Sequence, residues 1–290
     1  MDLLRAVILG IVQGATEFLP VSSSGHLVLV PWLLNWPAPG LVFDTLVHWG
    51  TLLAVVIYFR DDLSALARAW LASIRECSLN PDPDRRLAWL ILIGTIPIGL
   101  AGLLFENFFE GLFGRPGLAA GLLLVTGLLL IASERWHRPR RQGEGGTRRQ
   151  GERSPCPLVP SSPCPLTIAG ALFIGLAQAL AIAPGISRSG ATIAAGLLVG
   201  LSRQESARFS FLLAMPAILG AGVLQLVDLM ESGTALTQLP TLIIGFIAAG
   251  VTGYLAIRLL LDYLQRHTLN VFAVYCWIVG LMGLVVYWLR

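Results

Sequence analysis

The chain has 290 residues, of which 55% are hydrophobic and only 13% are charged, whereas soluble domains carry roughly 25% charged residues. This composition excludes an ordinary soluble enzyme and a disordered protein, and it favours a polytopic membrane protein. The net charge is +3 and all 20 basic residues are arginines. This balance argues against a nucleic-acid partner, which requires a basic stripe on a soluble face.

The first apolar region, Leu3–Leu34, is interrupted in its middle by Glu17, Pro20 and three serines. It therefore predicts a helix, a polar break and a second helix. Non-helical backbone at membrane depth is tolerated only where protein buries it or where it lines a water-filled cavity. We predict a re-entrant helical hairpin here.

Three apolar stretches follow, each near the roughly 20 residues that a membrane-spanning helix needs: Val42–Phe59, Leu87–Phe105 and Leu118–Ala132. We expect an ordinary loop around Glu106 and Glu110. Arg138–Pro165 comes next and is rich in Arg, Gly, Pro and Ser, a composition that cannot bury enough apolar surface to fold. Residues 1–137 are thus predicted to be a first membrane repeat and residues 138–165 a disordered cytoplasmic linker.

The second half, residues 166–290, shows the same order of elements. Ile168–Leu201 is apolar but contains Pro184 and Arg188, so we predict a second re-entrant hairpin. Three further stretches can span a membrane: Ala207–Val227, Leu239–Leu261 and Val271–Leu289. The predicted fold is an all-α polytopic membrane protein with six transmembrane helices and two re-entrant helical hairpins.

Matching residues recur between the halves at fixed shifts. A shift of 165 places Gly10 on Gly175, Gln13 on Gln178, Ser22 on Ser187, Ser24 on Ser189 and Gly25 on Gly190, and a shift of 151 places Gly94, Gly99 and Gly102 on Gly245, Gly250 and Gly253. Three spans is an odd number, so the second half is expected to be inverted. Inverted repeats bring broken helices together near the membrane midplane; the alternative is chance similarity among helices rich in Gly, Ala and Leu.

Arginine placement predicts the orientation, because cytoplasmic loops carry an excess of basic residues. The loops after the first and third spans are rich in arginine, whereas the loop after the second span holds only Arg115 and Asp228–Gln238 holds none. We expect both termini on the outer face. The first hairpin then enters from outside and the second from the cytoplasm.

The first break, Gln13–His26, reads QGATEFLPVSSSGH. Ionisable residues inside a membrane protein are costly and indicate function, and glycine lets backbone approach a ligand. The plainer alternatives are buried hydrogen-bonding roles for the carboxylate and imidazole, and helix capping for the serines. The candidate site residues are Glu17, Ser22, Ser23, Ser24, Gly25 and His26. Nearby, Asp44 and His48 either support the site or anchor the surface.

The second break, Pro184–Thr192, reads PGISRSGAT. It offers hydroxyls, a permanent cation and a glycine at a helix N-terminus, where exposed N–H groups favour an anion. Arg188 adds bidentate phosphate recognition. The candidate residues are Ser187, Arg188, Ser189, Gly190 and Thr192. A carboxylate, hydroxyls and an imidazole in one half, with an anion site in the other, suit phosphate-ester chemistry.

These two motifs resemble the signature motifs of the undecaprenyl-diphosphatase family, the bacitracin-resistance proteins, and the resemblance covers essentially the whole chain. It implies a multi-pass phosphatase of the bacterial inner membrane that hydrolyses undecaprenyl diphosphate and recycles the lipid carrier for peptidoglycan synthesis. It also implies a divalent cation, magnesium or calcium. The family's acidic motif falls on Gln13 and Glu17, so its first acid is absent here and Gln13 receives no acid/base role. Its serine-histidine segment falls on Ser22, Ser23 and His26, and its arginine motif falls on Ser187, Arg188, Ser189 and Thr192.

A mechanism follows from these assignments. The terminal phosphate is expected between Arg188 and the helix N-terminus, with Glu17 as a cation ligand. Ser23 is the predicted nucleophile with His26 as general base or acid, and a water activated by Glu17 or His26 is the rival. The expected phosphate-binding residues are Ser22, Ser24, Gly25, Ser187, Ser189, Gly190 and Thr192.

The expected partners are a polyprenyl diphosphate lipid and membrane lipids, with a homodimer left open, and the active site is expected to open to the outer, periplasmic face. The alternative function is a transporter or flippase of a polyprenyl phosphate lipid. A carrier needs no nucleophile beside a base, so phosphate release distinguishes the two functions.

Overall fold

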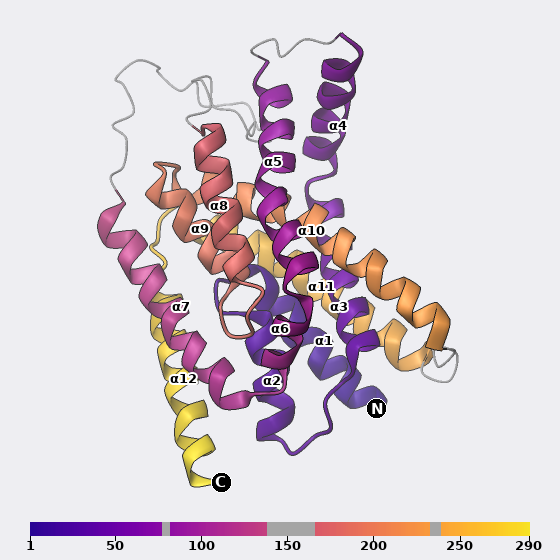
Figure 1. Ribbon diagram of the computed structural model, residues 1–290. Helices are drawn as coiled ribbons and strands as arrows, with labels where there is room; N and C mark the ends of the chain where they lie inside the picture. The colour runs from indigo at the N-terminus through magenta and orange to yellow at the C-terminus, as the bar shows by residue number, and fades with distance from the viewer. Residues whose placement is uncertain (77–81, 138–165, 233–238) are drawn as a thin grey trace.

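The computed structural model describes residues 1–76, 82–137, 166–232 and 239–290, and these residues form helices with no strand among them. The first half comprises α1 (Leu3–Phe18), α2 (Ser23–Leu33), α3 (Leu41–Tyr58), α4 (Arg60–Arg75), α5 (Pro83–Leu104), α6 (Glu106–Phe113) and α7 (Pro116–Trp136). The second half comprises α8 (Ile168–Leu180), α9 (Arg188–Leu198), α10 (Arg203–Ser232), α11 (Leu239–Tyr263) and α12 (Asn270–Leu289). Figure 1 shows their arrangement. The predicted linker, residues 138–165, lies outside the described residues.

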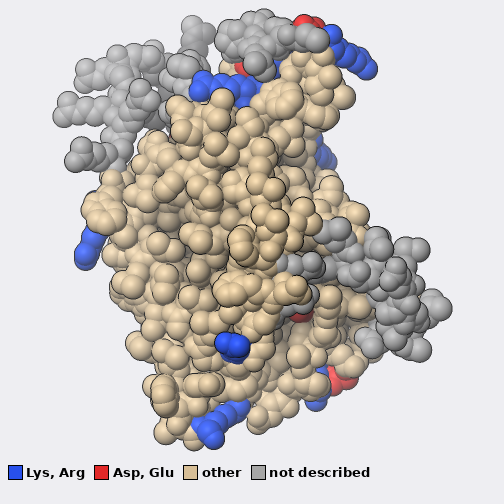
Figure 2. All heavy atoms as spheres, in the orientation of Figure 1, with Lys and Arg blue, Asp and Glu red and all other residues tan. Residues whose placement is uncertain are grey.

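Six of these helices, α3, α5, α7, α10, α11 and α12, are long and apolar enough to cross a membrane. They coincide with the six predicted stretches, and this part of the prediction is confirmed. Helix α7 runs past the predicted Leu118–Ala132 because its polar end is satisfied: Ser133 Oγ donates to the Leu130 carbonyl over 2.9 Å and Arg203 pairs with Glu134 at 2.6 Å. Charged residues gather toward the two ends of the face in Figure 2, leaving an almost uncharged band between them.

Two helices were not predicted. Helix α4 lies in the arginine-rich segment after the first span, where Asp61 and Asp62 in its first turn and Arg75 in its last turn complement the helix dipole. It packs against α5, and Trp89 Nε1 donates to Ser73 Oγ over 2.8 Å. The loop expected around Glu106 and Glu110 is wrong, because these residues lie in the eight-residue helix α6. No proline interrupts that segment before Pro116.

The two interrupted apolar regions each form a helix, a break and a second helix. The first break separates α1 from α2 and contains Pro20 and Ser22, whose φ of 70° is left-handed. The second break separates α8 from α9 and contains Gly185, with a φ of 103°. Helix α1 begins at the end of the molecule that holds both termini, whereas α8 begins at the opposite end (Figure 1).

Each of these broken regions packs on a helix of the other half. Helix α1 lies against α11, and α8 lies against α5. A Cβ added at Gly10 would meet the carbonyl oxygen of Gly245, and one added at Gly175 would meet that of Gly94. Backbone therefore touches backbone at both crossings, which requires glycine because any side chain would collide with main-chain atoms.

Candidate active site

A single carboxylate, Glu17 in the last turn of α1, is the centre of the site. Its side chain is 3% exposed, and its Oε1 accepts a hydrogen bond and ion pair from Arg188 Nη2. Its Oε2 accepts hydrogen bonds from Gln13 Nε2 at 2.9 Å and from Ser23 Oγ at 2.5 Å. The Nε2 of His48 lies 3.7 Å from the same oxygen. Side chains from α1, α2, α3 and α9 thus converge on one buried carboxylate.

The two breaks place these side chains. Pro20 cannot continue α1, and α2 begins at Ser23 behind the capping residue Ser22, whose Oγ accepts from Gly25 N at 3.2 Å. Ser187 caps α9 in the same way, accepting from Gly190 N at 3.0 Å, so Arg188 is the first helical residue.

The breaks also touch one another. A Cβ at Gly25 would lie 3.1 Å from Gly185 Cα, and Ser189 Oγ donates to the Leu19 carbonyl over 3.1 Å. Thr126 of α7 fixes the second break from the side, because its hydroxyl donates to the Gly185 carbonyl and accepts from Ser187 N, both at 3.0 Å. The structure therefore joins the two motifs that the sequence separates by more than half its length.

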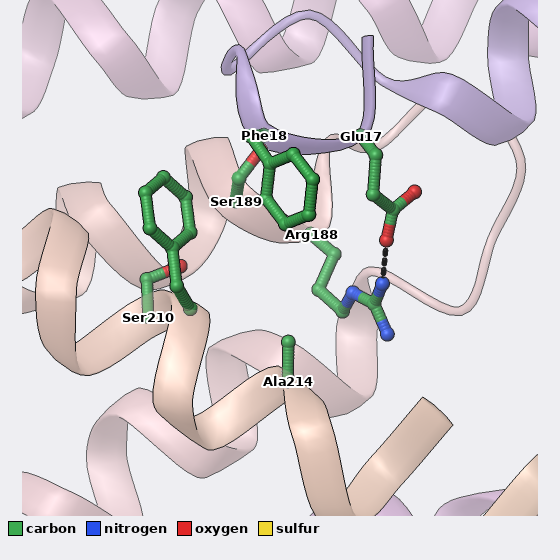
Figure 3. A pocket seen from close by; sticks show the side chains of 7 residues that line it. Glu17, Phe18, Arg188, Ser189, Ser210 and Ala214 are labelled. Carbon is green, nitrogen blue, oxygen red and sulfur yellow. Dashed lines mark hydrogen bonds and ion pairs between the residues drawn. The ribbon is translucent and has the colours of Figure 1, made fainter. Parts of the chain in front are cut away.

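A pocket opens beside this cluster and is shown in Figure 3. Its lining residues are Glu17, Phe18, Arg188, Ser189, Ser210, Phe211 and Ala214. The Arg188 side chain is 21% exposed, whereas the Glu17 side chain is only 3% exposed. Of these two charged groups, the guanidinium is therefore the one that an incoming molecule can contact. Phe18, Phe211 and Ala214 add an apolar wall next to it. The lining thus combines a cation with an apolar surface, and the space between them is about the size of one water molecule.

The hydroxyls of the second motif are already engaged. Ser189 Oγ donates to the Leu19 carbonyl, and Thr192 Oγ1 donates to the Arg188 carbonyl over 2.7 Å. A carbonyl oxygen can only accept, so the protons of these hydroxyls point into the protein. In this arrangement the two residues hold the break in shape. Their phosphate-binding role, like that of Ser22, Ser24, Gly25, Ser187 and Gly190, stays a prediction.

His26 has partners other than Ser23. Its Nδ1 lies 2.8 Å from the Ser22 carbonyl oxygen and its Nε2 lies 2.9 Å from the Tyr275 hydroxyl, on which the ring also stacks. The carbonyl requires a proton on Nδ1, so in the neutral ring Nε2 accepts from Tyr275. Glu17, rather than His26, is the hydrogen-bond acceptor for Ser23 here. A general-base role for His26 stays a prediction.

His48 is the residue that the sequence left open and that the structure places at the site. Its Nδ1 lies 2.7 Å from the Asp44 carbonyl, which fixes the ring with Nε2 toward Glu17. In the sequence, His48 could be noticed only as an ionisable residue inside an apolar span. Its position in the span indicates how deep it lies in the membrane but not which residue it contacts.

The side chains around Glu17 fit a divalent cation in one respect. Gln13 Oε1 is buried and has no hydrogen-bond partner among the described residues, although it lies in the same side chain that contacts Glu17. Magnesium and calcium prefer carboxylate and amide oxygens as ligands. Within the described residues, no group of three or more His, Cys, Asp or Glu side chains forms a metal-binding cluster. A cation here would therefore take further ligands from phosphate and water, as magnesium commonly does.

The chain is similar to known proteins over nearly its whole length. The family model described as bacitracin resistance protein BacA matches residues 6–282. A relative from Thermomicrobium roseum named undecaprenyl-diphosphatase is 42% identical, over 99% of this chain and 98% of its own. Relatives of the same name from Rubrobacter xylanophilus and Methanobrevibacter smithii are each 44% identical, over 95% and 97% of this chain and 94% and 96% of their own.

Proposed function

The chain belongs to the bacitracin resistance protein BacA family, and on that premise we propose that it hydrolyses undecaprenyl diphosphate to undecaprenyl phosphate and inorganic phosphate. The reaction returns the lipid carrier to peptidoglycan and cell-envelope synthesis. The observation that carries the proposal is the buried contact of Glu17 with Ser23 and Arg188 beside a pocket with an apolar wall. Carboxylate, hydroxyl and guanidinium can supply the base, the nucleophile and the anion-binding group of a phosphate transfer.

Arg188 is the group that binds the terminal phosphate in this proposal. Its planar fork matches two phosphate oxygens, and its partial exposure makes it accessible from the pocket. An incoming diphosphate competes with Glu17 for the guanidinium. As Arg188 turns to the phosphate, Glu17 loses a cation and becomes a stronger base. Substrate binding thereby prepares the carboxylate for proton transfer.

Ser23 is the proposed nucleophile, with Glu17 as its base, and the 2.5 Å hydrogen bond between them supports this assignment. Ser23 Oγ attacks the terminal phosphorus, its proton passes to Glu17, and the bond from that phosphorus to the bridging oxygen breaks. Undecaprenyl phosphate leaves, and water then hydrolyses the phosphoserine to release inorganic phosphate. The rival route is direct attack by a water that Glu17 activates. A divalent cation held by Glu17 and Gln13 would neutralise charge on the phosphate oxygens; because it would also lower the basicity of Glu17, it belongs to a route in which Glu17 is a ligand rather than the base.

The two halves are proposed to be an inverted repeat with two re-entrant hairpins. Ser22 caps α2 through Gly25 as Ser187 caps α9 through Gly190, at the same shift of 165. The contact of Gly10 with Gly245 likewise corresponds to that of Gly175 with Gly94, at shifts of 165 and 151. These matching contacts support a repeat over chance similarity among glycine-rich helices.

We propose that the protein lies in the inner membrane with both termini outside and the site opening to the outer face. Helix α1 begins and helix α12 ends at one pole of the molecule, and the arginine-rich segment containing α4 lies at the other (Figure 1). Cytoplasmic loops carry the excess of arginine. The uncharged band between the poles is the surface that membrane lipids would cover (Figure 2).

The experiment that tests the function is phosphate release from undecaprenyl diphosphate by the purified protein in detergent, with Ser23→Ala as the matched inactive control. Release by the wild type alone is the expected result. A flippase would instead move polyprenyl phosphate across vesicle membranes without releasing phosphate from the diphosphate. Absence of release by a folded wild-type protein, with or without magnesium and calcium, contradicts the proposal.

A further inference from the structure

Ser210 lies on α10, outside both sequence motifs, and lines the pocket opposite Arg188 (Figure 3). It is 2% exposed, and its Oγ lies 2.6 Å from Thr192 Oγ1 on α9. A hydroxyl on an apolar helix commonly bonds its own preceding carbonyl. The described contact of Ser210 runs to another helix instead, which indicates a role beyond its own backbone.

The direction of this hydrogen bond follows from the partners of Thr192. Its hydroxyl has one proton, which goes to the backbone carbonyl of Arg188 at 2.7 Å or that of Ser189 at 3.2 Å. Both are acceptors only, so Thr192 has no proton left for Ser210. Ser210 is therefore the donor to Thr192. Two hydroxyls in series connect α10 to the first turn of α9.

We propose that Ser210 is a positioning residue for Arg188 and acts through Thr192. The proposal rests on the proposed function, because it assigns Arg188 to the terminal phosphate. Arg188 is the first residue of α9, where the backbone has few intrahelical hydrogen bonds to fix it. The Ser210–Thr192 link holds that turn against α10, which sets where the guanidinium points. A small displacement of a group that must meet two phosphate oxygens lowers the rate strongly.

The first test is substitution of Ser210 with a control on the same helix. Ser210→Ala is expected to lower kcat by about tenfold with little change in KM, because one hydrogen bond that orients the transition-state contact is lost. Ser210→Thr keeps the hydroxyl and is expected to restore most of the loss. Ser206 lies one turn earlier, is 1% exposed, and its Oγ has no partner among the described residues. Ser206→Ala should leave kcat unchanged; a loss equal to that of Ser210→Ala would overturn the proposal.

The second test asks whether Ser210 acts through Thr192 or on the substrate directly. Thr192→Val removes the hydroxyl at similar shape, and Ser210→Ala is then expected to cost nothing more in that background. Additive losses would contradict the proposal, because they would mean that Ser210 contacts substrate independently. The same set of variants, each single substitution and the double one, is also compared by the rise in melting temperature on adding inorganic diphosphate. If the wild type released no phosphate, the proposed function would fail, while this binding cycle would still decide whether Ser210 positions Arg188.

Discussion

Replacing Arg188 with lysine separates charge from geometry at the site. Glu17 is 3% exposed and paired with Arg188, and leaving a buried charge unpaired costs about 3–5 kcal/mol of folding free energy. Arg188→Ala would therefore confuse misfolding with lost catalysis. Arg188→Lys keeps a cation near Glu17, so the protein is expected to insert and fold. Lysine lacks the planar fork and the reach of arginine.

The magnitude follows from the number of contacts removed. A fork on two phosphate oxygens becomes a single point contact, and loss of one preorganised donor costs roughly 10²–10³ in kcat. We expect Arg188→Lys to lose about that factor in kcat while KM changes much less. The assay is phosphate release from undecaprenyl diphosphate in detergent. Thermal unfolding of each variant measures stability in parallel.

Arg203→Lys is the matched control. Arg203 pairs with Glu134 at 2.6 Å, and the Glu134 side chain is 6% exposed, but neither residue lines the pocket. Arg203 donates three hydrogen bonds to Glu134 whereas Arg188 donates one to Glu17, so Arg203→Lys should lose at least as much stability as Arg188→Lys. Only Arg188→Lys should lose turnover. Turnover of Arg188→Lys within a few-fold of wild type would refute the reasoning and reduce Arg188 to an electrostatic or structural residue.

Three further results are expected. Ser23→Ala should cut phosphate release by several orders of magnitude while lipid diphosphate still binds, and His26→Ala should lower phosphate release by less. If Ser23→Ala kept more than about a tenth of wild-type turnover, the covalent route would be contradicted, because a lost nucleophile cannot be replaced by proximity. His48→Ala should lower kcat modestly, because the ring lies 3.7 Å from Glu17 and fills the space beside it without hydrogen-bonding it; an unchanged kcat at equal stability would place His48 outside the site. Deleting residues 143–162 should leave insertion and phosphate release nearly intact, as judged at equal expression, and a collapse of activity would show that this segment takes part in function.

The sequence predicted the site best at charged residues, because burying a charge inside a membrane protein costs much free energy. A carboxylate at Glu17 and a guanidinium at Arg188 interrupt apolar stretches, and burial of such groups has few explanations other than function. The same reasoning located the six spans, because length and hydropathy suffice for a membrane helix. Helix α4 was not predicted, because its arginine-rich segment indicates the orientation of the protein but carries no apolar run that would indicate a membrane helix.

The roles of the serine and threonine hydroxyls could not be predicted from the sequence. Ser210 and Thr126 sit in apolar helices, where a hydroxyl can bond a preceding carbonyl of its own helix at little cost. Nothing in their local sequence distinguishes them from Ser206, which has no partner among the described residues. Their roles depend on contacts between helices distant in sequence. His48 was undecided for the same reason, since its partner Glu17 lies 31 residues earlier on another helix.

The glycine crossings between α1 and α11 and between α8 and α5 have a consequence for how such a molecule could arise. The broken helix pair of each half packs against a helix of the other half. Either half alone would therefore expose the glycine surface that the other half now covers. If the halves are the inverted repeat proposed above, one half alone would need a second copy inserted in the opposite sense to cover that surface. Joining both halves in one chain fixes the pairing and lets them differ, with the acid at Glu17 in one and the cation at Arg188 in the other.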